Sequence, residues 1–131
     1  MTVLIGYVPT PVGEAALAAG LAEAAAHGED AVILNSPRRG STVDSKLVGD
    51  EDAARLVAEA AGLGVTATLD HADHGADIVD AFTSAVETHG ARLVVIGLRR
   101  RSPVGKLVMG SDAQRLLLEL DTPVLAVKPA R

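Results

Sequence analysis

The chain has 131 residues, of which 48% are hydrophobic, 22% are charged and 2% are aromatic. A chain of this length buries enough surface to fold without disulfides or a structural metal, and the absence of cysteine excludes disulfides, thiolate nucleophiles and cysteine-ligated metal sites. The net charge of -5 and the scarcity of aromatic rings argue against a nucleic acid partner, which would require positive charge and stacking surfaces.

Targeting and membrane-spanning segments are not evident in the sequence. No apolar run approaches the length that spans a bilayer, and the first residues lack the basic start and the long apolar stretch of a signal peptide. We therefore expect one domain over residues 1–131, located in the cytoplasm and without a membrane partner.

Five short runs rich in valine, isoleucine and leucine predict five strands. The runs are too short for helices, and their continuous apolar character is typical of strands buried on both faces, as in a parallel sheet covered by helices on each side. They lie at residues 3–5, 31–34, 65–69, 93–96 and 124–127.

The segments between these runs have the spacing of helices. Leu17 and Leu21 share a face of the first helix. The next three helices carry apolar stripes at Ala53, Leu56, Val57 and Ala60, at Ile78, Phe82, Ala85 and Val86, and at Ala113, Leu116, Leu117 and Leu120. Glycines at 28, 62, 64 and 90 follow helical segments, where a left-handed terminal residue is favoured.

Strands and helices therefore alternate along the chain. Because crossover connections are right-handed, few topologies remain. We predict an α/β fold, a doubly wound five-stranded parallel sheet with helices on both faces. In such folds the ligand lies outside the carboxyl ends of the strands, so function is expected in the loops that follow strands. These loops are residues 7–13, 35–50, 71–75 and 98–110.

The segment IGLRRRSPVGKLVMGSDAQRLL leaves a predicted strand at Gly97 and enters the last predicted helix at Gly110 and Ser111. A helix N-terminus presents unpaired N–H groups and partial positive charge, and glycines let a phosphate approach the backbone. The segment therefore predicts an anion site, to which the Ser111 hydroxyl and four nearby cations would contribute. The cations are Arg99, Arg100, Arg101 and Lys106.

These features also have simpler explanations. Ser111 and Gln114 have the spacing of a capping box, in which Ser111 only begins the helix. A run of arginines is commonly a solvated surface. A Walker A loop is excluded, because it needs glycine at Arg100 and serine or threonine at Leu107.

The same segment resembles the signature of the universal stress protein family, Gly-x2-Gly-x9-Gly-(Ser/Thr). Gly97 matches the first glycine, Gly110 the third and Ser111 the hydroxyl residue. The alternation of strands and helices and the closing TPVLAVKP are also similar to this family, so the resemblance covers nearly the whole chain. It implies a Rossmann-like fold of the adenine nucleotide alpha hydrolase type. It also implies a protein that binds ATP or AMP, with or without Mg2+, and acts in stress response or signalling through partners.

The sequence departs from the family pattern at three positions of the nucleotide site. Arg100 stands at the second glycine, where its side chain either prevents a close backbone approach or contacts phosphate directly. Val8 stands where ATP-binding relatives have an aspartate, and Asp112 places a negative charge beside the expected phosphate. Thr10 falls on a serine position of the family and keeps a hydroxyl there.

By the same resemblance, Leu34 and Asn35 lie where the family contacts adenine, largely through backbone groups. Arg38, Arg39 and Ser41 either reach a phosphate or a partner, or belong to a solvated loop. The complete set of nucleotide contacts implied by the resemblance is Val8, Pro9, Thr10, Leu34, Asn35, Gly97, Arg99, Arg100, Gly110, Ser111 and Asp112.

Two other functions fit the sequence. One is a dimeric interaction module of the same fold that binds no nucleotide; residues 123–128 resemble the family's last strand, which often pairs with its copy, so we expect a homodimer through this strand. The other is a metal site at His71, Asp73 and His74, residues that equally suit an ordinary turn into a helix. The sequence shows no catalytic set, so we expect at most slow ATP hydrolysis.

Overall fold

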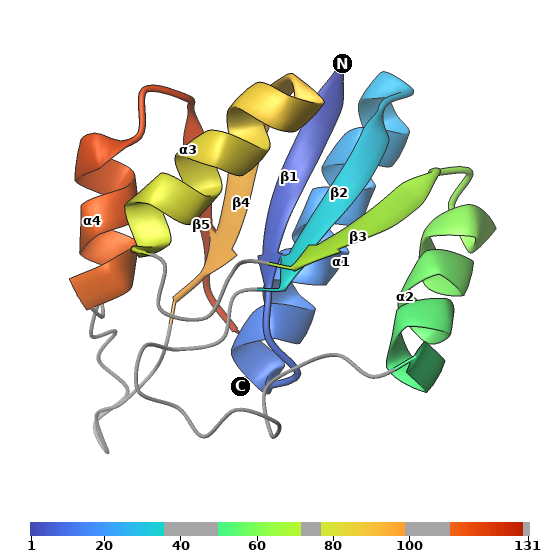
Figure 1. The fold of residues 1–131 in the computed structure, drawn as a ribbon. Helices are drawn as coiled ribbons and strands as arrows, with labels where there is room; N and C mark the ends of the chain where they lie inside the picture. The colour runs from blue at the N-terminus through green and yellow to red at the C-terminus, as the bar shows by residue number, and fades with distance from the viewer. Residues whose placement is uncertain (36–49, 72–76, 99–110, 130–131) are drawn as a thin grey trace.

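The computed structural model describes residues 1–35, 50–71, 77–98 and 111–129. Strands and helices alternate along these residues, as predicted (Figure 1). The strands are β1 (Thr2–Tyr7), β2 (Asp30–Asn35), β3 (Ala67–His71), β4 (Ala91–Gly97) and β5 (Val124–Val127). The helices are α1 (Pro11–His27), α2 (Asp50–Gly62), α3 (Ile78–His89) and α4 (Ser111–Glu119).

The strands form one parallel sheet in the order β3-β2-β1-β4-β5. In the central strand β1, Val3 pairs with Ala31 of β2 on one side and with Leu93 of β4 on the other. The chain moves outward from β1 to β3 and returns at β4, so the switch point of the topology lies between β1 and β4. Helices α1 and α2 cover one face and α3 and α4 the other (Figure 1). The predicted doubly wound parallel sheet is confirmed.

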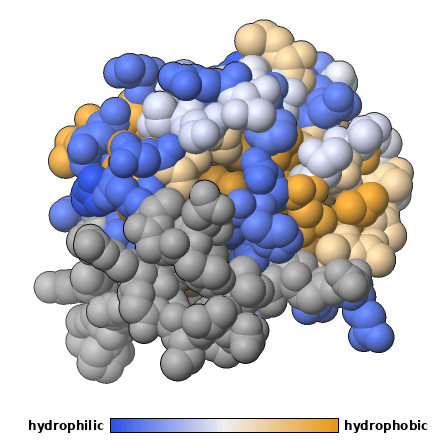
Figure 2. Space-filling model, viewed as in Figure 1, coloured by the Kyte–Doolittle hydropathy of each residue, from blue (hydrophilic) through white to orange (hydrophobic). Residues whose placement is uncertain are grey.

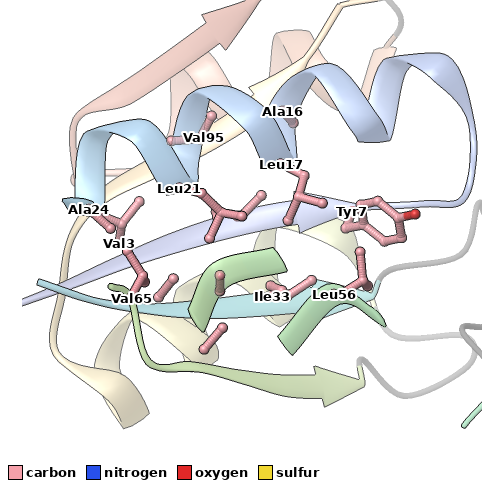
Figure 3. Close-up of a cluster of buried hydrophobic side chains, with 14 residues drawn as sticks. Val3, Tyr7, Ala16, Leu17, Leu21, Ala24, Ile33, Leu56, Val65 and Val95 are labelled. Carbon is pink, nitrogen blue, oxygen red and sulfur yellow. The ribbon is translucent and has the colours of Figure 1, made fainter. Parts of the chain in front are cut away.

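The face beneath α1 and α2 carries a cluster of buried side chains. Leu17 and Leu21 of α1 and Leu56 of α2 pack against Val3 and neighbouring strand residues (Figure 3). Full burial of such a side chain contributes about 1.5 to 3 kcal/mol. Tyr7 lies at one end of the cluster, and its hydroxyl points away from the aliphatic side chains (Figure 3).

The opposite face is covered by α3 and α4. Phe82 of α3 and Leu116 of α4 pack with Leu4 and Val94 of the central strands. Gly6 of β1 lies against the Phe82 ring, because a Cβ on this residue would come 2.8 Å from Cζ of the ring. Because Gly6 has no side chain, the ring of Phe82 can pack directly against β1.

Burial differs from the prediction at two elements. Val57 belongs to the stripe predicted for α2, yet 39% of it is exposed, because the face of α2 that packs on the sheet is formed by the other three residues of the stripe, Ala53, Leu56 and Ala60. The last strand was expected to be buried on both faces, yet Leu125 is 40% exposed, because β5 is an edge strand with a partner on one side only. Figure 2 shows small hydrophobic areas among polar side chains on this face of the molecule.

Three of the four predicted glycines are left-handed and follow a helix, namely Gly28, Gly64 and Gly90, whereas Gly62 is the last residue of α2. Gly28 after α1 and Gly90 after α3 are left-handed, with φ of 65° and 64°, and the N–H of Gly90 bonds the carbonyl of Val86. Within the residues listed at the start of this subsection, no helix combines the length and the apolar character needed to cross a bilayer.

Candidate functional site

The turn from β1 into α1 is fixed by its own backbone and by one hydroxyl. The N–H of Thr10 donates to the carbonyl of Val8 at 2.7 Å, and the N–H of Glu14 donates to the carbonyl of Thr10 at 2.9 Å. Thr10 is the N-cap of α1, and its Oγ1 accepts from the N–H of Gly13 at 3.2 Å. A hydroxyl that accepts in this way keeps its proton to donate. Pro9 is exposed and Val8 and Thr10 are half-buried at this edge of the sheet.

Gly97 ends β4 beside the first turn of α1. A Cβ on Gly97 would come 2.4 Å from the carbonyl oxygen of Val12 and 2.5 Å from its Cγ1. Because that oxygen belongs to the backbone, such a contact requires α1 to move. The first glycine of the family signature is therefore needed here for the packing of α1 against β4, across the switch point.

Leu34 and Asn35 end β2, next to the end of β1. Leu34 is 1% exposed and belongs to the cluster on the α3 side, and Asn35 is completely buried. Nδ2 of Asn35 donates to the carbonyl of Tyr7 at 3.0 Å and so ties the end of β2 to the end of β1. Both side chains stabilise the fold, and a role of their backbone groups in ligand binding stays a prediction.

The first turn of α4 contains two of the predicted residues. Ser111 begins the helix and Asp112 is half-buried in the same turn. The side chain of Ser111, and with it the capping box, lies outside the described part of the chain. The other predicted residues that lie outside the described part are Arg38, Arg39, Ser41, Asp73, His74, Arg99, Arg100, Arg101, Lys106 and Gly110.

A hydrogen-bonded cluster that the sequence did not reveal adjoins the β1–α1 turn. Oη of Tyr7 donates to Oε1 of Glu14 at 2.6 Å, and Nη2 of Arg55 donates to the same oxygen at 3.1 Å. Nη1 of Arg55 also donates to Glu59 at 2.7 Å, a pair whose i, i+4 spacing is visible in the sequence. Burial, followed by the hydrogen bond with Glu14, raises the pKa of Tyr7 to about 12. The cluster links β1, α1 and α2 at the carboxyl edge.

An ion pair that the sequence also did not reveal joins α3 and α4. Asp77 is the N-cap of α3, and its Oδ2 accepts from the N–H groups of Val79 at 3.2 Å and Asp80 at 3.3 Å. The guanidinium of Arg115 binds both oxygens of this carboxylate. The hydrogen bond from Arg115 holds the pKa of Asp77 below its ordinary value. An aspartate before an apolar run indicates a cap, but nothing local indicates its distant partner.

The predicted metal set is described only in part. His71, the last residue of β3, is exposed, and the neighbouring Asp70 is paired with His89 of α3, with 2.9 Å between Oδ2 and Nε2. Among the residues whose positions are described, no group of three histidine or acidic side chains could hold a metal ion. Because Asp73 and His74 lie outside that part, the metal hypothesis stays a prediction.

Comparison with known proteins identifies relatives over nearly the whole chain. Residues 1–128 match the model of the Universal stress protein family. A universal stress protein of Mycolicibacterium smegmatis is 36% identical over 127 residues, which make up 97% of this chain and 97% of that protein.

Solved structures share the fold at lower identity. A universal stress protein from Archaeoglobus fulgidus has a TM-score of 0.75 and 24% identity, and the match covers 98% of each chain. The structure of the universal stress protein from Archaeoglobus fulgidus in complex with dAMP has a TM-score of 0.71 and 20% identity, again over 98% of each chain. The fold, the family model and the curated relative agree, and the chain belongs to the universal stress protein family.

Proposed function

We propose that the protein binds an adenine nucleotide, ATP or AMP, at the carboxyl edge of the sheet beside the switch point between β1 and β4, and that it acts in stress response or signalling through partners. The observation that carries the proposal is the geometry of this edge. The capped first turn of α1 packs directly against the end of β4 at Gly97, so the two strand ends and a helix N-terminus meet at one place.

The chemistry of this edge suits a nucleotide. Helices α1 and α4 both begin there, and helix N-termini carry the partial positive charge that phosphate prefers. Thr10 has a hydroxyl proton to donate, and the ends of β1 and β2 are held together by the Asn35 amide. A related fold from Archaeoglobus fulgidus in complex with dAMP adds support for an adenine ligand.

Two residues of this edge set limits on the ligand. Val8 offers no polar group where ATP-binding relatives have an aspartate, so one polar contact with the nucleotide is missing. Asp112 brings a negative charge to the first turn of α4, where it favours the helix dipole and opposes phosphate. A ligand with fewer phosphate charges, or with its charge neutralised by Mg2+, is therefore favoured at this site.

The test is a thermal-shift titration with ATP, ADP, AMP and GTP, each with and without Mg2+. A ligand at a hundred times its dissociation constant adds about 2.7 kcal/mol to stability, which is a shift of several degrees for a domain of this size. We expect a saturating shift with adenine nucleotides that GTP does not reproduce. No shift at millimolar nucleotide, in a protein that unfolds cooperatively, overturns the proposal.

Two variants connect such binding to the proposed site. Gly110→Val should abolish binding while the fold stays intact, because the resemblance implies that phosphate approaches the backbone at this glycine. Val8→Asp should restore the family's polar contact and tighten binding by about tenfold, the effect of one charged hydrogen bond. Val8→Leu is the matched control and should leave the dissociation constant unchanged. Full binding by Gly110→Val would refute the proposed location.

A second candidate function is a dimeric interaction module that binds no nucleotide. It is favoured by the edge position of β5, which has β4 on one side, and by Leu125, which is 40% exposed. According to this hypothesis, residues 123–128 pair with the same residues of a second copy, and the side chain of Leu125 is buried in the dimer. The two candidates differ in whether a nucleotide binds; dimerisation through β5 alone is compatible with either, because β5 lies at the edge of the sheet and β4 separates it from β1.

A further inference from the structure

Asp77 and Arg115 form an ion pair between the N-cap of α3 and the second turn of α4. Both helices begin at the carboxyl edge of the sheet, and Figure 1 shows the first turn of α3 beside α4. Nη1 of Arg115 contacts Oδ1 of Asp77, and Nη2 contacts Oδ2 at 3.1 Å. The geometry is bidentate, the form of this ion pair with the greatest strength and directional specificity.

Each partner of the pair is also held within its own helix. Oδ2 of Asp77 accepts two backbone N–H groups as the cap of α3, and Nε of Arg115 donates to Oε2 of Glu119 at 3.0 Å. A side chain already fixed on one side loses little further freedom when it forms the pair. The pair therefore resists rotation of α4 relative to α3 more strongly than an isolated surface ion pair does.

Helix α4 packs on the sheet through Leu116, with Ala113 and Leu117 partly buried against the same cluster, and the pair with Asp77 adds a polar contact to α3. The helix has nine residues, and Leu116 is the one that is nearly fully buried among those whose burial is described. Arg115 stands four residues after Ser111 and three after Asp112, which places it on the same face, one turn further along. Fixing Arg115 therefore fixes the turn that carries the proposed phosphate contacts.

We infer that Asp77 and Arg115 are positioning residues for the nucleotide site. Their ion pair sets the orientation of the first turn of α4 and so raises the affinity for the phosphate end of the ligand without touching it. This inference rests on the proposed function, because it concerns the affinity of that site.

The test compares three ligands on four proteins. Asp77→Asn keeps a good N-cap and loses the charged pair, and Arg115→Gln loses the guanidinium. Dissociation constants for ATP, AMP and adenosine are measured by calorimetry for the wild type, the two variants and the double variant. We expect each single change to weaken ATP and AMP binding by roughly three- to tenfold and to leave adenosine binding unchanged. The double variant should bind no more weakly than the weaker single variant.

A matched control separates positioning from general stability. Arg92 makes a similar pair at the opposite edge of the sheet, where its Nε donates to Glu29 at 2.7 Å and its Nη2 to Glu23 at 3.2 Å. Arg92→Gln should lower the melting temperature and leave all three dissociation constants as in the wild type. Weakened nucleotide binding in this control would mean that lost stability explains the effect, which overturns the inference.

The remaining outcomes distinguish the inference from the function on which it rests. If the wild type binds ATP or AMP, and Asp77→Asn and Arg115→Gln have the same dissociation constants as the wild type, the inference is overturned and the proposed function remains. If the variants weaken adenosine binding as much as ATP and AMP binding, the inference is also overturned, because the ion pair would then not act on the phosphate end of the ligand. A wild type that binds no nucleotide overturns both.

Discussion

Three residues of the candidate site also stabilise the fold: Thr10, Asn35 and Gly97. Thr10 caps α1 with its hydroxyl oxygen, Asn35 holds β1 with its amide, and Gly97 lets the backbone of Val12 approach β4 because it has no side chain. Substitutions at these residues change stability as well as binding. Stability must therefore be measured beside affinity for every variant of the site.

Gly97→Ala should destabilise the protein. The added Cβ would lie 2.4 Å from the Val12 carbonyl oxygen, and relief of such overpacking typically costs about 1 to 3 kcal/mol. Gly62→Ala is the matched control, because nothing lies within 4 Å of its Cβ and alanine is the better helix former at the end of α2. Urea denaturation should show a lower midpoint for Gly97→Ala and an equal or higher one for Gly62→Ala. Equal midpoints for the two variants would contradict the close approach.

Tyr7 should make stability fall in strongly alkaline solution. Its pKa is raised from 10.0 to about 12, so the folded protein keeps the phenol proton where the unfolded chain loses it. The stabilisation is complete below pH 10 and is lost as the pH rises through about 12. We expect the difference in unfolding free energy between the wild type and Tyr7→Phe to shrink across this range.

The titration itself can be observed without a label. The chain has one tyrosine and no tryptophan, so the ultraviolet absorbance of phenolate reports Tyr7 alone. In the folded protein this absorbance should develop near pH 12, and in urea-denatured protein near pH 10. Ionisation of the folded protein at the ordinary pKa would show that burial and Glu14 do not hold the proton.

At the scale of the elements, local contacts explain where the structure departs from the sequence pattern. The apolar run that predicts the third strand begins at Val65, but β3 begins at Ala67. The N–H of Val65 donates to the carbonyl of Ala60 at 2.9 Å, so this residue completes the end of α2 and is buried there. Hydropathy predicts that such a residue is buried, but it does not predict whether its backbone N–H bonds within the helix or within the strand.

Helix α4 offers a matched pair for testing its packing. Leu116 is 3% exposed against the sheet, and Leu118 is 84% exposed on the same helix. Leu116→Ala should cost about 2 to 5 kcal/mol in unfolding free energy, because it leaves a cavity between α3, α4 and the sheet. Leu118→Ala should change it by less than about 0.5 kcal/mol. Chemical denaturation measures both, and similar losses for the two would mean that α4 is packed differently.

At the scale of the whole molecule, the architecture could be predicted because it is encoded locally. Apolar runs mark the strands, helical spacing marks the helices, and the handedness of crossovers limits the order of the sheet. The contacts between distant residues could not be predicted in this way. Asp77 and Arg115 are 38 residues apart and Arg92 and Glu29 are 63 apart, and no local pattern pairs them. The signature predicted a site at the carboxyl edge of the sheet, but it did not indicate that Gly97 packs against α1.

The proposed dimer is also a prediction for the whole molecule. If β5 pairs with its copy, sedimentation should give the mass of a dimer at micromolar concentrations. Leu125→Glu should shift the equilibrium to monomer, because it would bury a charge where the two β5 strands meet. Leu63→Glu is the control, because Leu63 is 55% exposed beyond α2, on the side of the sheet away from β5. A wild type that is monomeric at these concentrations counts against pairing through β5.

The contact between Gly97 and Val12 also has an evolutionary consequence. A glycine that packing requires is retained by selection for folding alone, whether or not a descendant still uses the ligand. A lineage that lost nucleotide binding would keep this glycine and change elsewhere, at positions such as Val8 and Arg100. In this chain the presence of Gly97 is therefore explained by folding, and it is not by itself evidence that a nucleotide is bound.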